Sequence, residues 1–196
     1  MQFTPITLQT EQVILQPLSE QHLPALLIAG RPPQIWQWVF ENYCLNEQTL
    51  RAWYQSSAQF NAHQQLVFAT FDKASETLVG TTRLFRLDTQ NNSLEIGHTF
   101  IHPDWQRSYI NTHAKYLMLK YAFETLGIVR VSFVTHEKNT LSRNAISRLG
   151  ATFEGIIRKV RLLPNGEYRN SAQFSITDDD WPAIKQALET MMQEWQ

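Results

Sequence analysis

The sequence contains little cysteine, no long apolar run and no excess of charge of one sign. Cys44 is the only cysteine in 196 residues, so we expect a buried small side chain rather than an internal disulfide. No apolar run reaches the roughly 18 residues that cross a bilayer, and no basic-then-apolar leader is visible, which predicts a cytoplasmic chain without a membrane partner. Lys and Arg number 17 against 18 Asp and Glu, which excludes a whole-molecule field that attracts nucleic acid.

Internal repeats, low-complexity tracts and Gly/Ser linkers are also missing, so we expect residues 1–196 to form a single domain. The His, Cys and carboxylate residues lack the spacing of metal ligands, and we therefore expect no metal. Neither a G-x-S-x-G elbow nor a Walker loop is present. A basic stripe with interleaved aromatic residues is missing too, which argues against nucleic-acid binding.

What the chain does contain is an ordered series of short strand and helix patterns. Hydrophobic periodicity separates them, and single Gly or Pro residues punctuate them. The first half predicts a strand at 13–18, a helix at 19–30 with Ser19 as N-cap, a helix at 46–63 with Leu50, Trp53, Tyr54 and Phe60 near one face, and a hairpin at 65–72 and 77–88.

The second half predicts a central parallel strand pair. A helix joins the strands at 93–101 and 128–135, so they should run parallel with a right-handed crossover, which indicates an α/β fold with a mixed sheet. The other predicted elements are a helix up to Gly127 with Asn111 or Thr112 as N-cap and one buried stripe from Ala114 to Thr125, a helix from Asn139 to Gly150, a hairpin turned at Asn165-Gly166, and a helix from Trp181 to Trp195 that packs on the body or on a second subunit of a homodimer.

A polar loop, “HPDWQRS”, leads from the strand at 93–101 into the next helix. The start of a helix leaves backbone N–H groups unsatisfied and carries partial positive charge, so it can bind a phosphate group. Arg107 adds a formal positive charge, and Gln106, Ser108 and Asn111 can donate hydrogen bonds. For the loop by itself, a capped helix start without a ligand is the simpler interpretation.

Several spaced motifs occur in one order along the chain, and this order resembles the GNAT superfamily of acyl-CoA-dependent N-acetyltransferases. The resemblance is greatest to the branch of the RimJ and RimL ribosomal-protein N-terminal acetyltransferases. It is carried by “EIG” from Glu95, “HPDWQR” from His102, “NTxAKxLxL” from Asn111, “NxxSRxAIxRLGA” from Asn139 and “PNGxxR” from Pro164.

The resemblance implies a GNAT fold with a splayed central parallel strand pair and acetyl-CoA as co-substrate. It also implies transfer of an acetyl group to a primary amine, either on a small molecule or at a peptide N-terminus. The alternative is a degenerate GNAT domain that binds coenzyme A or nothing and serves as a binding or regulatory module.

In GNAT proteins a Q/R-x-x-G-x-G/A loop wraps the coenzyme pyrophosphate, and the pantetheine lies between the splayed strands. Tyr109 and Asn111 stand at the glycine positions of this loop. At Tyr109 we expect either a positive φ or, preferably, a slightly opened loop with fewer amides aimed at the ligand. The coenzyme contacts that the resemblance implies are Phe100, Ile101, Gln106, Arg107, Ser108, Tyr109, Ile110, Asn111, Thr112, Asn139 and Arg143.

Acetyl transfer requires a base for the amine, a backbone N–H that polarises the thioester carbonyl, and a proton for the leaving thiolate. Glu95 is the first candidate for the base, and the alternative is a structural Glu paired with Arg83 or Arg130. His98 has a suitable ordinary pKa, but three residues along a regular strand place it on the face opposite to Glu95. His136 is the third candidate.

The sequence signals are less specific for the residue that protonates the thiolate and for the residues that line the acceptor site. Ser142 can donate the proton, although it is equally an N3 residue of its helix; Tyr168 and Tyr109 are the other candidates. Trp36 and Trp38, together with Phe40, are candidates to contact the acceptor, and an aromatic core is the alternative. The near-neutral surface does not identify the acceptor.

Overall fold

The computed structural model describes residues 1–39, 41–163 and 166–195. Within these residues, eight strands form one sheet in the order β1-β2-β3-β4-β5-β6-β8-β7. The pair β5–β6 is parallel and the other neighbouring pairs are antiparallel, which confirms the predicted mixed sheet. The strands are β1 (Leu8–Gln9), β2 (Val13–Pro17), β3 (Gln65–Asp72), β4 (Thr77–Asp88), β5 (Ser93–Ile101), β6 (Arg130–His136), β7 (Thr152–Leu162) and β8 (Tyr168–Thr177).

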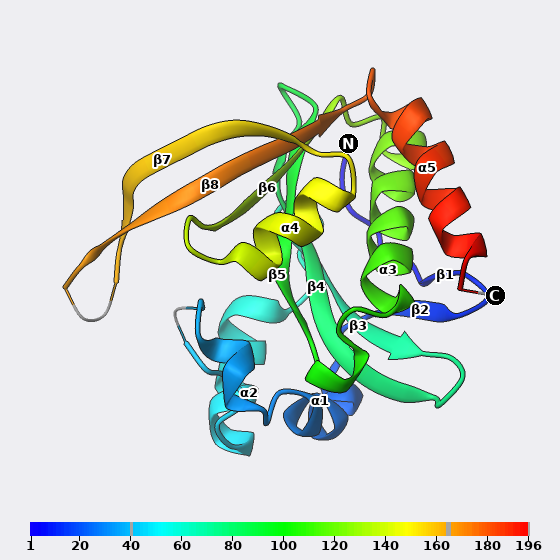
Figure 1. Cartoon of the computed structure of the whole chain (residues 1–196). Helices are drawn as coiled ribbons and strands as arrows, with labels where there is room; N and C mark the ends of the chain where they lie inside the picture. The colour runs from blue at the N-terminus through cyan, green and yellow to red at the C-terminus, as the bar shows by residue number, and fades with distance from the viewer. Residues whose placement is uncertain (40, 164–165, 196) are drawn as a thin grey trace.

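Helices cover the sheet from both sides (Figure 1). Short 3₁₀ turns at Glu20–His22, Pro33–Trp36 and Pro103–Trp105 connect some of them, and π-helical turns extend α2 over Tyr54–Ala58 and α3 over Tyr121–Thr125. The helices are α1 (Leu23–Ala29), α2 (Glu47–Trp53), α3 (Tyr109–Lys120), α4 (Thr140–Arg148) and α5 (Trp181–Gln193).

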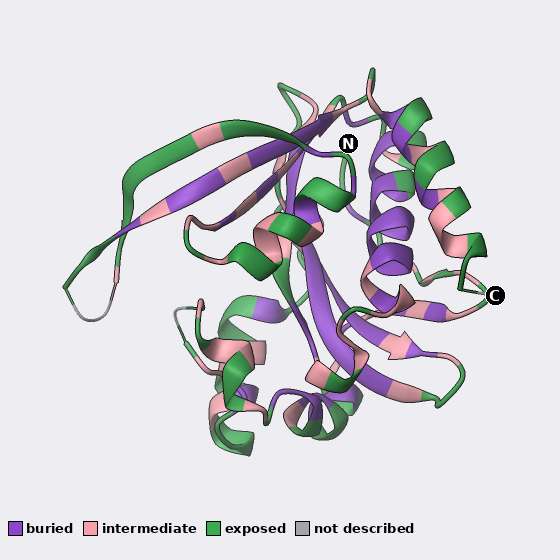
Figure 2. Ribbon diagram, viewed as in Figure 1, coloured by how far each residue is buried: buried purple, intermediate pink, exposed green. Residues whose placement is uncertain are grey.

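Alternation along the strands divides the core into two clusters. Leu66 and Phe68 of β3 belong to the cluster with α3, α4 and α5, whereas Val67 and Ala69 belong to the cluster with α1 and α2. Successive strand residues point to opposite faces, so these two clusters lie on opposite sides of the sheet. The central strands are accordingly buried from both sides (Figure 2).

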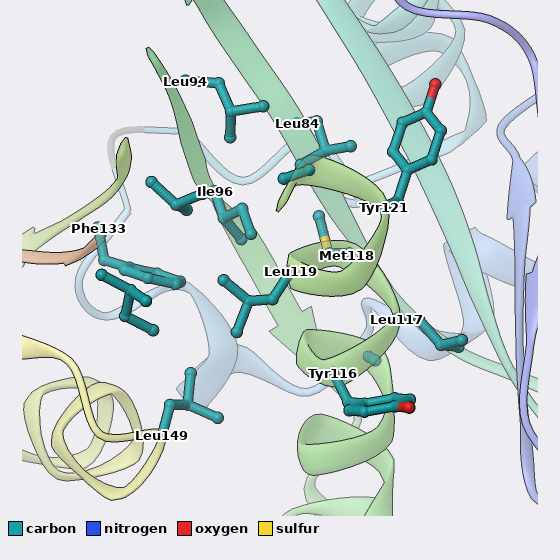
Figure 3. Packing of buried hydrophobic residues seen from close by; sticks show 14 of the residues in the cluster. Leu84, Leu94, Ile96, Tyr116, Leu117, Met118, Leu119, Tyr121, Phe133 and Leu149 are labelled. Carbon is teal, nitrogen blue, oxygen red and sulfur yellow. The ribbon is translucent and has the colours of Figure 1, made fainter. Parts of the chain in front are cut away.

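The helix α3 is buried on almost every side, which corrects the prediction of one buried stripe. Residues 112–119 are all buried, and Thr125, at the end of the predicted stripe, is exposed. Leu119 points toward Phe133, whereas Tyr116 leaves the helix on another side (Figure 3). There Tyr116 Oη donates a 2.7 Å hydrogen bond to Glu189 of α5. Hence α5 packs on the body of its own chain, covering the face of α3 that the sheet leaves open.

Two predicted boundaries are wrong, and one turn lies outside the described residues. The helix predicted at 46–63 ends at Ala58 because Gln59 is extended, and Phe60 is exposed. The N-cap of α3 is Ser108, not Asn111 or Thr112. Asn165 of the predicted β7–β8 turn is not described.

Candidate active site

The strands β5 and β6 pair only where they begin. Ser93, Leu94 and Glu95 pair with residues 130–132, after which β5 continues along β4 and β6 continues along β8 (Figure 1). The facing edges beyond Glu95 therefore carry backbone groups that an extended, amide-containing ligand can hydrogen-bond. This divergence is the splayed parallel pair that the sequence predicts.

A β-bulge in β5 changes the direction of His98. Thr81 pairs with Phe100 and Arg83 with Gly97, so Thr82 lies opposite two residues, the first of which is His98. The φ of His98 is 48°. The extra residue interrupts the alternation of side chains.

The consequence is that His98 and Glu95 share a face. The His98 ring lies 5.0 Å, between centroids, from the ring of Phe85, and Phe85 pairs with Glu95. Cross-strand partners point to the same side of a sheet. The prediction that His98 and Glu95 point to opposite faces is therefore wrong.

Glu95 is buried and makes an ion pair at the edge of the site. Its Oε2 accepts a 2.9 Å hydrogen bond from Arg86 Nη1, so neither Arg83 nor Arg130, the partners considered from sequence, holds it. Desolvation raises the pKa of Glu95, while the charges of Arg86 and Arg161 oppose that rise. A carboxylate with a raised pKa is a better proton acceptor at neutral pH than an ordinary Glu.

The surroundings of His98 favour its neutral form. Desolvation by the surrounding protein lowers its pKa to about 4, and the positive charges of Arg83, Arg161, Arg86 and Arg169 act in the same direction. The residue is nevertheless exposed to solvent, so water moderates the size of the shift without changing its direction. The pKa of His98 is thus lowered and that of Glu95 is raised, which favours Glu95 as the base.

The loop between β5 and α3 is held by its own side chains. Gln106 Nε2 donates a 2.9 Å hydrogen bond to the carbonyl of Ile101, and Ser108 Oγ donates one of 2.6 Å to the carbonyl of Trp105. The positive φ of the loop, 60°, falls on Arg107 and not on Tyr109. Tyr109 has begun the helix, so the predicted choice between strain and opening at that residue does not arise.

The hydroxyl of Tyr109 is engaged in a structural hydrogen bond, which makes it a poor candidate for a catalytic proton donor. Its Oη donates a 2.6 Å hydrogen bond to Asp72 Oδ1 at the end of β3. That hydrogen bond raises the pKa of Tyr109 to about 12. Tyr168, the other tyrosine considered as a proton donor, is exposed at the start of β8.

Three of the predicted coenzyme contacts can bind a ligand only through their backbone groups. Phe100, Ile101 and Ile110 are buried in the two core clusters, so their side chains are occupied by packing. The first turn of α3, by contrast, begins with backbone N–H groups that have no partner within the helix. Asn111 and the exposed Arg107 lie at this turn.

The start of α4 has the predicted N-cap, but the side chain of Arg143 is directed toward β7. Asn139 is the N-cap, its Oδ1 accepting a 3.1 Å hydrogen bond from the backbone N–H of Ser142, the N3 residue. Arg143 donates to the carbonyl of Glu137 at 2.9 Å and lies over Phe153 of β7. Its guanidinium is thus held toward β7.

The sequence analysis missed Arg148. Its Nη2 donates a 3.4 Å hydrogen bond to Thr112 Oγ1 and so brings a positive charge from the end of α4 to the first turn of α3. The signal in the sequence was its position in the “SRxAIxRLGA” motif. Its proximity to the first turn of α3 depends on how the two helices pack.

The two tryptophans proposed for the acceptor site have different surroundings. Trp36 Nε1 donates to the carbonyl of Gly30 at 2.8 Å, and its ring packs 5.4 Å from that of Phe100. Trp38 instead lies 4.8 Å, between ring centroids, from His136 at the end of β6. Trp36 is therefore a packing residue, and Trp38 lies beside the splayed strands. Phe40 is outside the described residues.

The described part of the chain contains neither a metal-ligand cluster nor a membrane-spanning helix. No three His, Cys, Asp or Glu side chains are grouped so that they could hold a metal ion there. Among the helices of the same residues, none has both the length and the apolar character needed to span a membrane.

Comparison with known proteins agrees with this geometry. Residues 12–152 match the model of the acetyltransferase (GNAT) domain. The chain belongs to the GNAT acetyltransferase family, as its motifs predict. It is therefore an N-acetyltransferase that uses acetyl-CoA as co-substrate and transfers the acetyl group to an amine.

Particular relatives extend the likeness over nearly the whole chain. A GCN5-related N-acetyltransferase from Brucella melitensis has a TM-score of 0.90 and 32% identity, covering 96% of this chain and 86% of that one. YdaF of Bacillus subtilis (strain 168), named as a candidate ribosomal N-acetyltransferase, is 27% identical over 178 residues, or 88% of this chain and 93% of YdaF. RimJ from Mycobacterium smegmatis, in complex with CoA-disulfide, has the same fold, with a TM-score of 0.73, 18% identity and 95% of each chain covered.

Proposed function

We propose that the enzyme acetylates a primary amine at a peptide N-terminus or on a small molecule, with Glu95 as general base. The observation that carries the proposal is the burial of Glu95 at the point where β5 and β6 separate. There, a raised pKa and proximity to the splayed strands combine in one carboxylate. Glu95 accepts the amine proton directly or through a water molecule.

The coenzyme would be held by backbone and by two cations. Amides of the first turn of α3, together with Arg107 and Arg148, suit the phosphate groups. The open edges of β5 and β6 suit the amides of the pantetheine arm. Acetyl-CoA supplies the acetyl group as a thioester, and a backbone N–H of the bulge at His98 would polarise its carbonyl.

The proton donor and the wall of the acceptor site would come from residues near the end of β6. Ser142, in the first turn of α4, is the candidate donor of a proton to the leaving thiolate. Trp38 and His136 would form one wall of the acceptor site. The name of YdaF supports a ribosomal-protein N-terminus as acceptor.

The alternative of a degenerate GNAT domain was based on Tyr109, which stands at a glycine position of the loop. The conformation of the loop does not support that argument. Tyr109 has a helical conformation, and the left-handed conformation is adopted two residues earlier by Arg107. Glycine is therefore not required at position 109. Nothing else in the described loop argues against coenzyme binding.

Thiol release from acetyl-CoA in the presence of an amine panel tests the proposal. The panel consists of short peptides with free N-termini, small primary amines, and the same peptides with blocked N-termini as matched controls. We expect release with at least one free amine and none above background with the blocked peptides. No release with any amine, while acetyl-CoA still raises the melting temperature, would favour the degenerate module.

A further inference from the structure

Arg83 of β4 is a buried cation without a counter-charge in the described structure. It is 7% exposed, its Nη1 donates a 2.8 Å hydrogen bond to Gln65 Oε1, and its Nε is buried without a hydrogen-bond partner. The ion pairs formed by the described residues do not include Arg83. Burying an unpaired charge is costly, so this position calls for an anion.

Arg83 lies on the face of the sheet that carries Glu95. It alternates with Leu84, which faces α3, and it therefore shares a side of β4 with Phe85, the partner of Glu95. Its guanidinium lies 5.9 Å from the centroid of the Trp53 ring. Tyr43 stacks on that ring at 3.9 Å. The surroundings of Arg83 are therefore largely aromatic, and the polar groups near it are neutral: the Gln65 amide, the Tyr43 phenol and the His98 ring.

Further positive charge surrounds the same place. The charges of Arg83, Arg86, Arg161 and Arg169 all act on His98, the residue that follows the β5 partner of Arg83. Arg161 and Arg169 also lie opposite each other across the β7–β8 hairpin. Glu95 pairs with one of them, Arg86. Positive side chains therefore gather on the side of β5 that carries His98 and the proposed base.

The phosphate groups of the coenzyme are poorly placed to be this anion. Arg83 pairs with Gly97, and β5 continues to Ile101, about 13 Å further along the strand, before the loop begins. The loop then leads to α3 on the other face of the sheet. Arg83 thus belongs to the acceptor side.

We propose that Arg83 binds a carboxylate of the acceptor, so that the enzyme selects amines that carry a carboxylate near the amino group. Gln65 occupies Nη1, and the fork formed by Nε and Nη2 matches the two oxygens of a carboxylate, which has to displace the protein atoms that cover Nε in this structure. The carboxylate belongs either to an acidic residue that follows a peptide N-terminus or to a free amino acid. This inference rests on the acetyltransferase function proposed above.

Two matched pairs of acceptors test the proposal. One pair is a short peptide with Glu or Gln at its second position, and the other is a free amino acid and its amide. We expect kcat/KM to be at least roughly tenfold higher for the carboxylate member of one pair, as is usual when a buried charged partner is left unpaired. The pair that shows the difference identifies the source of the carboxylate.

The variant Arg83→Met removes the charge and keeps an unbranched side chain. It should bring the ratio of the two kcat/KM values close to one, while the melting shift caused by coenzyme A persists. Arg51→Met is the matched control, because Arg51 is an exposed arginine of α2 paired with Glu47. It should leave both activity and ratio unchanged. If Arg83→Met does not fold, Arg83→Lys retains the charge without the fork and should lower the ratio.

Each other outcome counts against the proposal. Equal kcat/KM values within both pairs for the native enzyme overturn it and leave the acetyltransferase function intact. A ratio that survives in Arg83→Met, or in Arg83→Lys if only that variant folds, removes Arg83 from acceptor recognition. Loss of the coenzyme A melting shift in the Arg83 variant assigns the residue to the coenzyme. No turnover of any acceptor, with coenzyme binding preserved, overturns both proposals.

Discussion

Glu95 combines burial with a charged partner, and the balance between them sets its pH response. Burial raises its pKa, and the hydrogen bond from Arg86 keeps part of the charge stabilised. A general base has to be unprotonated to act. The rate should therefore fall on the acid side as pH drops through a pKa that lies above the ordinary value for Glu.

We predict that Glu95→Gln lowers kcat by roughly 10²- to 10⁴-fold, the usual contribution of a general base, with little change in the KM for acetyl-CoA. The acidic limb of the kcat profile should disappear as well. Steady-state kinetics from pH 5 to 9 measure both effects. Glu47→Gln, which removes an exposed carboxylate paired with an arginine, is the control. Turnover that survives in Glu95→Gln but is abolished in His98→Ala would show that the base is His98.

Lys115 is the second buried residue whose charge state depends on its surroundings. Its Nζ donates to Thr82 Oγ1 at 2.8 Å and to Thr99 Oγ1 at 2.7 Å, beneath the bulge of β5. Burial lowers the pKa of Lys115 from 10.5 to about 7. Between these values the unfolded chain binds more protons than the folded one, so this residue makes stability rise with pH.

We predict that the free energy of unfolding of the native protein, relative to that of Lys115→Met, increases from pH 7 to pH 10. Denaturant unfolding of both proteins across this range measures the difference, in which shared titrating groups cancel. Lys120→Met, at an exposed position of the same helix, should show no such trend. A difference that is constant with pH would mean that Lys115 stays charged in the fold.

At the scale of elements, the loop before α3 is the segment that we propose binds the coenzyme phosphates. Asp72 holds its end from β3, because it accepts a hydrogen bond from Tyr109, the first residue of α3; Ser75 of the β3–β4 turn donates to the same carboxylate. Desolvation alone would raise the pKa of Asp72, but the hydrogen bonds from Ser75 and Tyr109 outweigh it, and the pKa is lowered. The loop is thus attached to the sheet at one end and to Ile101 through Gln106.

Within this loop, Arg107 combines a left-handed conformation with the positive charge. We predict that Arg107→Gly is more stable than Arg107→Ala by about 1 kcal/mol, because glycine adopts a φ of 60° without strain. Both variants should bind coenzyme A more weakly than the native protein, and the difference from native should shrink at high salt. Chemical denaturation and calorimetry at two salt concentrations separate the two effects. Native affinity in both variants would remove Arg107 from the phosphate site.

At the scale of the whole molecule, the proposed coenzyme site lies between strands and helices that are otherwise connected mainly through the sheet. It involves β5 and β6 in the sheet and α3 and α4 on one of its faces (Figure 1). A ligand that binds only the folded state stabilises it by mass action, about 2.7 kcal/mol at 100 times its dissociation constant. Coenzyme binding should therefore raise the free energy of unfolding of the whole domain.

We predict that coenzyme A at 100 times its dissociation constant raises the melting temperature by roughly 5–10 °C, given about 2–4 °C per kcal/mol for a chain of this size. Scanning fluorimetry with acetyl-CoA, coenzyme A and dephospho-coenzyme A measures the shift. Adenosine alone, which lacks pyrophosphate and pantetheine, is the control and should have little effect. A melting temperature that none of the coenzymes changes would contradict the site.

The sequence by itself determined the order of the elements, the parallel pair and the family, since the signals for these features are local. Asn139 caps α4, and Gly127 and Gly150 follow helices with φ of 67° and 92°, because caps and left-handed stops depend on a few neighbouring residues. Periods of two and 3.6 residues likewise depend only on the segment itself. Glu95, Ser142 and the loop 106–111 are candidates that the GNAT resemblance and the chemistry of acetyl transfer select, and they stay predictions.

Only the tertiary structure decided which side chains meet. A regular period predicts His98 on the wrong face, because the bulge at that residue depends on the register between β4 and β5. The ion pair of Glu95 with Arg86, the contact of Arg148 with Thr112 and the burial of Arg83 depend on the packing of segments distant in sequence. Charge and contact at the site are properties of that packing, and no local pattern encodes them.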